Sequence, residues 1–246
     1  YVYVSGTSPV FVKHFYDYAS SIIDKYEPQK DQLIIDIGSN DGTLLSFFQD
    51  EGYKVLGVDP AKDISKEANA KGIETITDFF SFNLAKKILN DNPKASIITA
   101  NNVFAHSDDL LGIIDGVKEL LSENGLFVFE VSYLLDVFEK TLFDTIYHEH
   151  LAYHSVKPLK KFFSSNGMEL IEVTRINTHG GSIRGVAQLA NGIRPISSSV
   201  SELIALEENI SIDKIETFKG FSNEINEIKN ELAKFLRSLK SDGKSI

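Results

Sequence analysis

Leu33-Ile34-Ile35-Asp36-Ile37-Gly38-Ser39-Asn40-Asp41-Gly42-Thr43 is the stretch of sequence that decides the fold. Its first five residues are apolar except for Asp36, as expected for a strand covered on both faces. The glycines that follow allow a tight turn and a close approach of the backbone to a ligand. The N-terminus of a helix after this turn would offer unpaired N–H groups. The stretch therefore predicts a buried strand, a ligand-binding loop and a helix.

On either side of this loop, short apolar runs alternate with amphipathic stretches, which is typical of repeated βα units. Five strands joined by helical crossovers indicate a doubly wound sheet. The expected strands are Leu33–Ile37, Lys54–Val58, Ile73–Thr77, Ala95–Ala100 and Leu126–Val131, followed by Met168–Ile176 and Ile183–Leu189. The expected helices are Gly42–Glu51, Ile64–Lys71, Phe82–Leu89, Asp109–Leu121 and Pro158–Asn166.

The chain divides into three expected parts. Residues 1–30 form an N-terminal lead-in segment and helix, and residues 31–192 form the ligand-binding domain. Residues 193–246 begin with a Pro- and Ser-rich linker, and apolar residues then recur at spacings of three and four up to Leu239. This spacing predicts one long amphipathic helix. Its apolar face could pack on its own domain, on a further domain or on a second subunit.

Composition excludes several classes of function. The 246 residues carry a formal net charge of -10 and show no basic stripe, so nucleic acid is not an expected partner. The chain has no cysteine, which excludes disulfides and thiolate metal sites within it. No apolar stretch approaches the roughly 18–20 residues of a membrane span. We expect a soluble cytoplasmic protein that acts on a small molecule.

The glycine loop favours S-adenosylmethionine (SAM) over NAD. A dinucleotide fingerprint would place glycine at positions 38, 40 and 43, whereas this chain has Asn40 and Thr43. SAM carries no phosphate; it has an ammonium, a carboxylate, a sulfonium, a ribose diol and an adenine. Acidic and amide side chains suit these groups. The sequence therefore predicts a Rossmann-like methyltransferase fold: a seven-stranded, mostly parallel α/β sheet with helices on both faces, plus a C-terminal amphipathic helix.

Polar side chains follow successive strands at their carboxyl ends, where open α/β sheets bind ligands. Asp59 is placed to accept the ribose hydroxyls, and Asp78 can accept the adenine amino group. Asn101 and Asn102 end the fourth strand, beside the expected sulfonium. The full set of predicted cofactor-binding residues is Asp36, Gly38, Asn40, Asp41, Gly42, Asp59, Asp78 and Asn101.

A histidine-rich segment, Phe143 to Ser155, follows the fifth strand and holds three of the six histidines. A metal site would use His148, His150 and His154, but their spacing is not that of the His-Glu-x-x-His metalloproteases. A structural loop of hydrogen-bonded histidines is a second interpretation. Acid–base chemistry is the third and the favoured one, because histidine titrates nearest neutral pH. We predict no metal.

Acid–base chemistry indicates carbon as the methyl acceptor. Oxygen and nitrogen nucleophiles often need little help to attack a sulfonium methyl, whereas a C–H beside a carbonyl must first lose its proton. The enolate must also be stabilised as it forms. His150 as base with Tyr147 fits this need, and His106 would lie across the cofactor edge. Glu149 can set the tautomer of a neighbouring histidine.

Four motifs in this order resemble those of the deoxysugar C-methyltransferases, which methylate C3 of nucleotide-linked 4-keto sugars. They are Tyr1 to Ser8, Asp36 to Gly42, Phe143 to His150 and His179 to Arg184. The resemblance spans nearly the whole chain. It implies that His150 removes the C3 proton with Tyr147, Glu149 and His106 around the 4-keto group. It also implies that the nucleotide-diphosphate sugar is held by Tyr3, His179, Gly180 and Arg184, the last on the diphosphate.

The chain departs from this family pattern at both ends. Members carry an N-terminal zinc-binding domain with cysteine ligands, and this cysteine-free chain opens about where that domain would end, so zinc is not expected here. Members also continue into a C-terminal α/β domain, and residues 193–246 resemble its start. Two alternatives to a C-methyltransferase stay open: an O- or N-methyltransferase on another small molecule, and a non-catalytic SAM-binding fragment.

Overall fold

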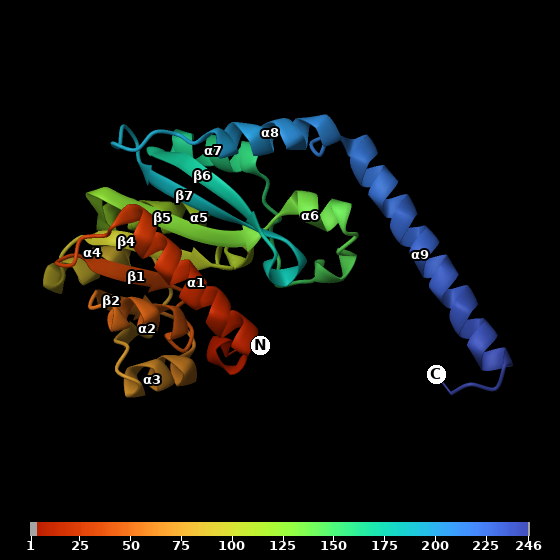
Figure 1. Cartoon of the computed structure of the whole chain (residues 1–246), viewed down its shortest axis with the longest axis horizontal. Helices are drawn as coiled ribbons and strands as arrows, with labels where there is room; N and C mark the ends of the chain where they lie inside the picture. Colours follow the sequence, from red (N-terminus) through yellow and green to blue (C-terminus); the bar gives the residue numbers. More distant parts are fainter. Residues whose placement is uncertain (1–3, 246) are drawn as a thin grey trace.

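A seven-stranded sheet forms the centre of the computed structural model, which describes residues 4–245 (Figure 1). The strand order is β3-β2-β1-β4-β5-β7-β6. The first five strands run parallel, and β7 is antiparallel to both of its neighbours, β5 and β6. This confirms the predicted mostly parallel sheet. The strands are β1 Leu33–Ile37, β2 Lys54–Val58, β3 Thr75–Ile76, β4 Ala95–Asn101, β5 Leu121–Ser132, β6 Met168–Ile176 and β7 Ser182–Leu189.

Helices cover both faces of the sheet, and each face has its own apolar core. Side chains of β1 alternate between the two: Ile34 packs with Tyr18 and Leu44, whereas Ile35 packs with Ile113 in the opposite core. The period of two is the one expected of a strand. The helices are α1 Pro9–Tyr26, α2 Thr43–Asp50, α3 Lys62–Ala70, α4 Phe82–Asp91, α5 Leu110–Leu120, α6 Leu134–Glu139, α7 Val156–Ser165, α8 Ser198–Ile210 and α9 Ile215–Ser241. Short 3₁₀ turns are η1 Ser5–Thr7, η2 Phe104–His106, η3 Phe143–Thr145 and η4 Thr178–Gly180.

Several elements differ from the sequence prediction, among them β5, which begins at Leu121 and not at Leu126, and helix α6, which was not predicted. The third strand is shorter than predicted, because β3 pairs with β2 through only Thr75 and Ile76 at the edge of the sheet. Helix α8 was not predicted and begins at Ser198, inside the expected linker. The Pro- and Ser-rich run there serves partly as a helix start, since the hydroxyl of Ser197 accepts the backbone N–H of Ser199. Val200 of α8 is buried in the domain core.

Helix α9 is long and amphipathic, as predicted, and extends away from the sheet (Figure 1). Its first turns pack on the domain, with the rings of Phe218 and Phe221 lying 5.0 and 4.6 Å from that of Phe138 on α6. Farther along, Leu232 and Phe235 are exposed. The near end of the apolar face therefore packs on its own domain. None of the helices described between residues 4 and 245 is long and apolar enough to cross a membrane.

Candidate functional site

The glycine loop after β1 is held against β2. The N–H groups of Gly38 and Ser39 both donate to the carbonyl of Val58, at 2.8 and 3.2 Å. Gly38 has φ +72°, and a Cβ there would lie 2.7 Å from Cγ2 of Val103. Only glycine therefore fits this position without strain or displacement of a neighbour. The turn brings the backbone close to the carboxyl end of β4.

Asp59, at the end of β2, anchors the same loop. Its Oδ2 accepts the N–H of Asn40 at 2.9 Å, and its Oδ1 accepts the N–H of Ala61 at 2.8 Å. The carboxylate is buried, yet each of its oxygens retains a further lone pair. It can therefore still accept the two hydroxyls of a ribose, the role that the sequence predicts. The side-chain oxygen of Asn40 accepts the N–H of Ser5, which ties the lead-in segment to the loop.

Asp36 lies buried beneath the loop with few partners for a negative charge. Burial raises the pKa of Asp36 to about 7, although the hydroxyl of Thr99 donates to its Oδ1 at 2.6 Å and lowers it, and the nearby charge of Asp59 raises it further. A carboxylate that ionises only near neutral pH favours a cation as its partner. The ammonium of SAM is such a cation, so Asp36 suits the predicted role.

Two other predicted acids lie differently. Burial raises the pKa of Asp41, but hydrogen bonds from Thr43 and Lys71 and the charge of Lys71 outweigh it and hold the pKa below its usual range. Its carboxylate is thus taken up by the loop itself, with Thr43 Oγ1 at 2.7 Å and Lys71 Nζ at 3.1 Å. Asp78 is exposed and accepts the N–H of Phe79 at 2.8 Å. Gly42, with φ +78°, completes the turn.

The amide of Asn101 lies at the end of β4. Both of its side-chain atoms are buried, and the amide interacts with the hydroxyl of Tyr18. The hydroxyl oxygen of Ser39 in the glycine loop is buried and has no hydrogen bond among residues 4–245. Buried polar groups are nearly always hydrogen-bonded, so a bound polar group can complete the contacts of these atoms. They lie on the loop and the strand where the cofactor is predicted to bind, and a group rich in donors and acceptors fits them.

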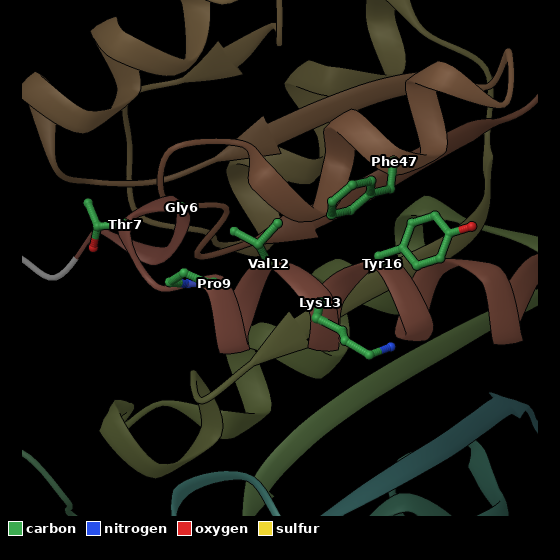
Figure 2. A pocket seen from close by; sticks show the side chains of 7 residues that line it. All are labelled: Gly6, Thr7, Pro9, Val12, Lys13, Tyr16 and Phe47. Atoms are coloured by element: carbon green, nitrogen blue, oxygen red, sulfur yellow. The ribbon is translucent and has the colours of Figure 1, made fainter.

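Two hollows lie on the helical side of the glycine loop. One, of about 570 Å³, lies between α1 and α2, where the rings of Tyr16 and Phe47 border it (Figure 2). The second, of about 540 Å³, adjoins Asp41, Gly42 and Lys71. The other predicted cofactor residues line neither hollow. The predicted cofactor site is therefore a different surface, at the carboxyl ends of the strands.

The histidine-rich segment brings together the predicted acid–base residues. His150 Nδ1 lies 2.9 Å from the carbonyl of Thr145, and its Nε2 lies 3.2 Å from the hydroxyl of Tyr147. A carbonyl can only accept, so Nδ1 carries the proton and Nε2 presents a lone pair. The ring of His106 lies 5.0 Å from that of His150. Nδ1 of His106 donates to the backbone carbonyl of Glu149 at 2.8 Å. Burial raises the pKa of Tyr147, and the charge of Glu149 adds to this.

The other two histidines of this segment lie apart from His150. The side chain of His148 is 89% exposed. His154 is mostly buried against Phe104, and burial lowers its pKa. Among residues 4–245 there is no group of three or more side chains that could hold a metal ion. His148 and His154 thus lie in different surroundings, one in solvent and the other in the core.

The residues predicted to hold the sugar nucleotide lie in different surroundings. His179 has φ +52° in the turn before β7, and its Nε2 accepts from the amide of Asn102 at 3.3 Å. A Cβ at Gly180 would meet Leu142 at 2.8 Å. Arg184 forms an ion pair with Glu130. Oε1 of Glu130 lies 2.8 Å from Nε and 2.6 Å from a terminal nitrogen of Arg184, so the charge of the arginine already has a partner. Tyr3 falls outside the described residues.

Two residues of the site were missed. Glu130 is a buried acid near the end of β5, and His14 on α1 reaches its other oxygen at 2.8 Å. An acid inside the apolar run Phe127 to Val131 was the available signal for Glu130, because charged residues are rarely buried without a partner. Nothing in the sequence around His14 marks it.

Comparison with protein-family models gives two matches. Residues 11–173 match the model described as a methyltransferase domain, and residues 177–246 match the one described as a C-methyltransferase C-terminal domain. Among curated proteins, C-methyltransferase NovU of Streptomyces niveus is 30% identical over 246 residues, which is all of this chain. The chain spans 59% of the length of that relative.

Solved structures share the fold. The chain resembles the magnesium protoporphyrin IX methyltransferase ChlM of Synechocystis PCC 6803, solved with bound SAH, with a TM-score of 0.56 and 16% identity. That match covers 73% of this chain and 83% of the other. The CcbJ methyltransferase of Streptomyces caelestis gives a TM-score of 0.55 at 14% identity over 72% of this chain and 89% of the other. At such low identity these likenesses show the architecture alone.

Proposed function

This chain belongs to the SAM-dependent methyltransferase family, and on that premise we propose that it transfers the SAM methyl group to a carbon beside a ketone. One observation carries the choice of carbon. His150 donates through Nδ1 to a backbone carbonyl, which leaves the lone pair of Nε2 available as a base. A base is needed to remove the proton of a C–H bond beside a ketone, and oxygen acceptors need it less. The match to the C-methyltransferase C-terminal domain supports the same choice.

The cofactor is proposed to bind at the glycine loop. SAM supplies an electrophilic methyl group on its sulfonium. Asp36 would hold its amino-acid end, the amide of Asn101 would lie beside the sulfonium, and Asp59 would accept the ribose hydroxyls. Asp78 is exposed beside the aromatic Phe79 and would take the adenine edge. The donor set is acidic and amide in character, which suits a cation without phosphates.

The residues around His150 would then handle the substrate proton. The hydroxyl of Tyr147 lies 3.2 Å from Nε2 of His150. A substrate C–H would take that place, and Nε2 would accept the proton as the base. The displaced Tyr147 hydroxyl would be free to donate to the oxygen on which the enolate charge develops. His106, whose ring is 5.0 Å from His150, borders the same space.

The proposed substrate is a nucleotide-linked 4-keto-deoxysugar, methylated at C3. The support is the resemblance of the motifs around Asp36, His150 and His179 to those of the deoxysugar C-methyltransferases. The NovU relative, a C-methyltransferase by name, supports the carbon acceptor. The partner is therefore a small molecule, and the proposed role is in deoxysugar biosynthesis.

The test replaces His150 with Gln and measures methyl transfer from SAM to a panel of nucleotide-linked keto sugars. We expect the rate to fall by about 10²- to 10⁴-fold while SAM binding, followed by calorimetry, stays within about threefold. His148→Gln is the matched control, because His148 is exposed and should leave both quantities unchanged. Methyl transfer that survives in His150→Gln would point to an oxygen or nitrogen acceptor. Absence of SAM binding to the folded chain would instead contradict both methyltransferase interpretations.

A further inference from the structure

A row of polar side chains crosses three neighbouring strands. Asn101 of β4 is in register with Glu130 of β5, and Glu130 is in register with Arg184 of β7. Since neighbours in register point to the same face of a sheet, the three side chains share one face. That face is the one covered by α1, because Val128 and Val186, two residues away in their strands, pack with Tyr18 of α1.

Glu130 is the centre of this row, and both of its oxygens are used. Oε1 accepts from Arg184 through Nε at 2.8 Å and a terminal nitrogen at 2.6 Å. Oε2 lies 2.8 Å from Nε2 of His14 on α1. The side chains of Glu130, Arg184 and His14 are only 3%, 17% and 17% exposed. A charged group so deeply buried needs fixed partners, and these three supply one another.

The contacts determine which nitrogen of His14 carries the proton. A carboxylate accepts, so Nε2 of His14 is the protonated nitrogen. Arg184 already balances the charge of Glu130, so the pair does not require a charged imidazole at position 14. The guanidinium is held further by the ring of Tyr18, 3.9 Å from its carbon, and by Ser21. The fork formed by Nε and one terminal nitrogen of Arg184 is thus taken up by Glu130 and is not open to a diphosphate.

Helix α1, which carries His14, lies beside the turn that holds His179. Burial lowers the pKa of His179, the charge of Glu130 raises it, and the charges of His14 and His150 lower it. The ring of His179 also lies 5.1 Å from that of Phe11, one turn before His14 on α1.

We propose that Glu130 is a positioning residue for methyl transfer, which fixes the tautomer and orientation of His14 at the substrate edge, and that Arg184 serves Glu130 instead of the substrate diphosphate. This inference rests on the proposed function for its kinetic part. It assigns a role to the acid in β5, and it replaces the predicted role of Arg184 with a different one. Glu130 would orient His14 in the way that a carboxylate orients a catalytic imidazole in many enzymes.

The kinetic test compares Glu130→Gln, Arg184→Lys, Arg184→Met and the double variant Glu130→Gln/Arg184→Met in the full chain. A positioning role predicts that kcat falls by about tenfold to 100-fold in Glu130→Gln while KM for the keto sugar stays within about threefold. The double variant removes both charges together. Its free energy of unfolding should therefore lie closer to that of wild type than the value for Arg184→Met, which leaves a buried carboxylate unpaired. If Arg184 bound the diphosphate, the double variant and Arg184→Lys would instead raise KM by about tenfold or more with kcat unchanged. That result would overturn the assignment.

A spectroscopic test reads His14 without any substrate. In a chain labelled with ¹⁵N-histidine, two-bond correlations distinguish the Nε2–H from the Nδ1–H tautomer. We expect His14 to show Nε2–H in wild type and a mixture in Glu130→Gln, with His14→Asn identifying the signal. An unchanged tautomer in Glu130→Gln overturns the proposal even if methyl transfer is observed. If wild type methylates no ketone, the proposed function fails, and the tautomer still decides whether Glu130 positions His14.

Discussion

The hydroxyl of Thr99 donates a 2.6 Å hydrogen bond to the carboxylate of Asp36, and this bond joins β4 to β1 at the base of the glycine loop. Both residues are buried, and the pKa of Asp36 stays at about 7 because one neutral donor does not offset the burial of a charge. The raised pKa of Asp36 suits the proposed cofactor site. An acid that is costly to ionise because it is buried can gain from a cationic ligand.

The pH dependence of stability follows from this pKa. Between its ordinary pKa near 4 and the folded value of about 7, Asp36 binds more protons in the folded than in the unfolded state, so stability falls as pH rises through that window. We expect Asp36→Asn, which keeps an acceptor for Thr99, to raise the free energy of unfolding at pH 8 by a few kcal/mol, about 4 at most. Near pH 4 the gain should vanish. Urea unfolding at several pH values measures this, with the exposed Asp63→Asn as control.

Cofactor binding by wild type should release a proton near neutral pH. If the SAM ammonium lies by Asp36, its charge lowers the pKa of that carboxyl, so SAM affinity rises with pH up to about 7. Calorimetry in two buffers of different ionisation enthalpy counts the released protons. In Asp36→Asn the release should disappear and the affinity should fall by about tenfold. Proton release that persists in this variant would assign it to another group.

Gly38 offers a test of the loop backbone. Gly38→Ala places a methyl group 2.7 Å from Val103 at φ +72° and should lower the free energy of unfolding by about 2–4 kcal/mol. Gly52→Ala is the matched control, because Gly52 has φ +81° but no atom within 4 Å of the added Cβ. It should cost only the backbone strain, about 1 kcal/mol. If thermal unfolding shows the same loss of free energy of unfolding in both variants, the side chain of Val103 moves aside without an energetic cost.

The sheet was largely predictable because its strands are buried on both faces and so read as continuous apolar runs. The expected strand Leu33–Ile37 matches β1 residue for residue, and all five of its residues are buried. The third strand was overestimated, since an edge strand ends where pairing ends and its sequence does not record that. Helix α8 was missed because Pro195 and the serines around Ser198 indicate a turn and a helix cap equally well.

The site was predictable where chemistry is local in the sequence. Tyr147 and His150 lie close together because they share one loop. His106 reaches His150 from the loop after β4. Long-range pairs were not visible. The contact between His14 and Glu130 spans 116 positions, and the register between β5 and β7 that places Arg184 on Glu130 arises only in the folded sheet.

Tyr147 and Tyr153 separate two roles in the histidine-rich segment. Tyr147→Phe removes the hydroxyl 3.2 Å from Nε2 of His150 and should lower kcat by about tenfold to 100-fold, with SAM affinity unchanged. Tyr153 donates to the carbonyl of Thr145, the acceptor that also fixes Nδ1 of His150. Tyr153→Phe should therefore change the rate less and leave the tautomer of His150 in place. A larger rate loss in Tyr153→Phe than in Tyr147→Phe would show that the hydroxyl of Tyr153 serves the reaction and would contradict the assignment to Tyr147.

Glu207 on α8 caps a helix that lacks a cap of its own. Helix α7 begins after Ser155, whose side chain makes no capping bond, and Glu207 accepts the N–H groups of Val156 and Lys157 at 2.5 and 3.0 Å. The same carboxylate accepts the hydroxyl of Tyr133 at 2.9 Å. A negative charge at a helix N-terminus is favourable, and here it is 2% exposed and poorly screened by salt.

Replacing Glu207 should therefore cost more than its position near the C-terminal end of α8 suggests. Glu207→Ala leaves two backbone donors and one hydroxyl buried without partners, and we expect the free energy of unfolding to fall by about 3 kcal/mol. The matched control is Glu208→Ala, which breaks only the half-exposed ion pair with Lys157 and should cost less than about 0.5 kcal/mol. Urea unfolding of both variants at low and high salt gives the comparison. Because the Glu207 contacts are buried, its loss should persist at high salt, and equal small losses in the two variants would show that α7 finds another cap.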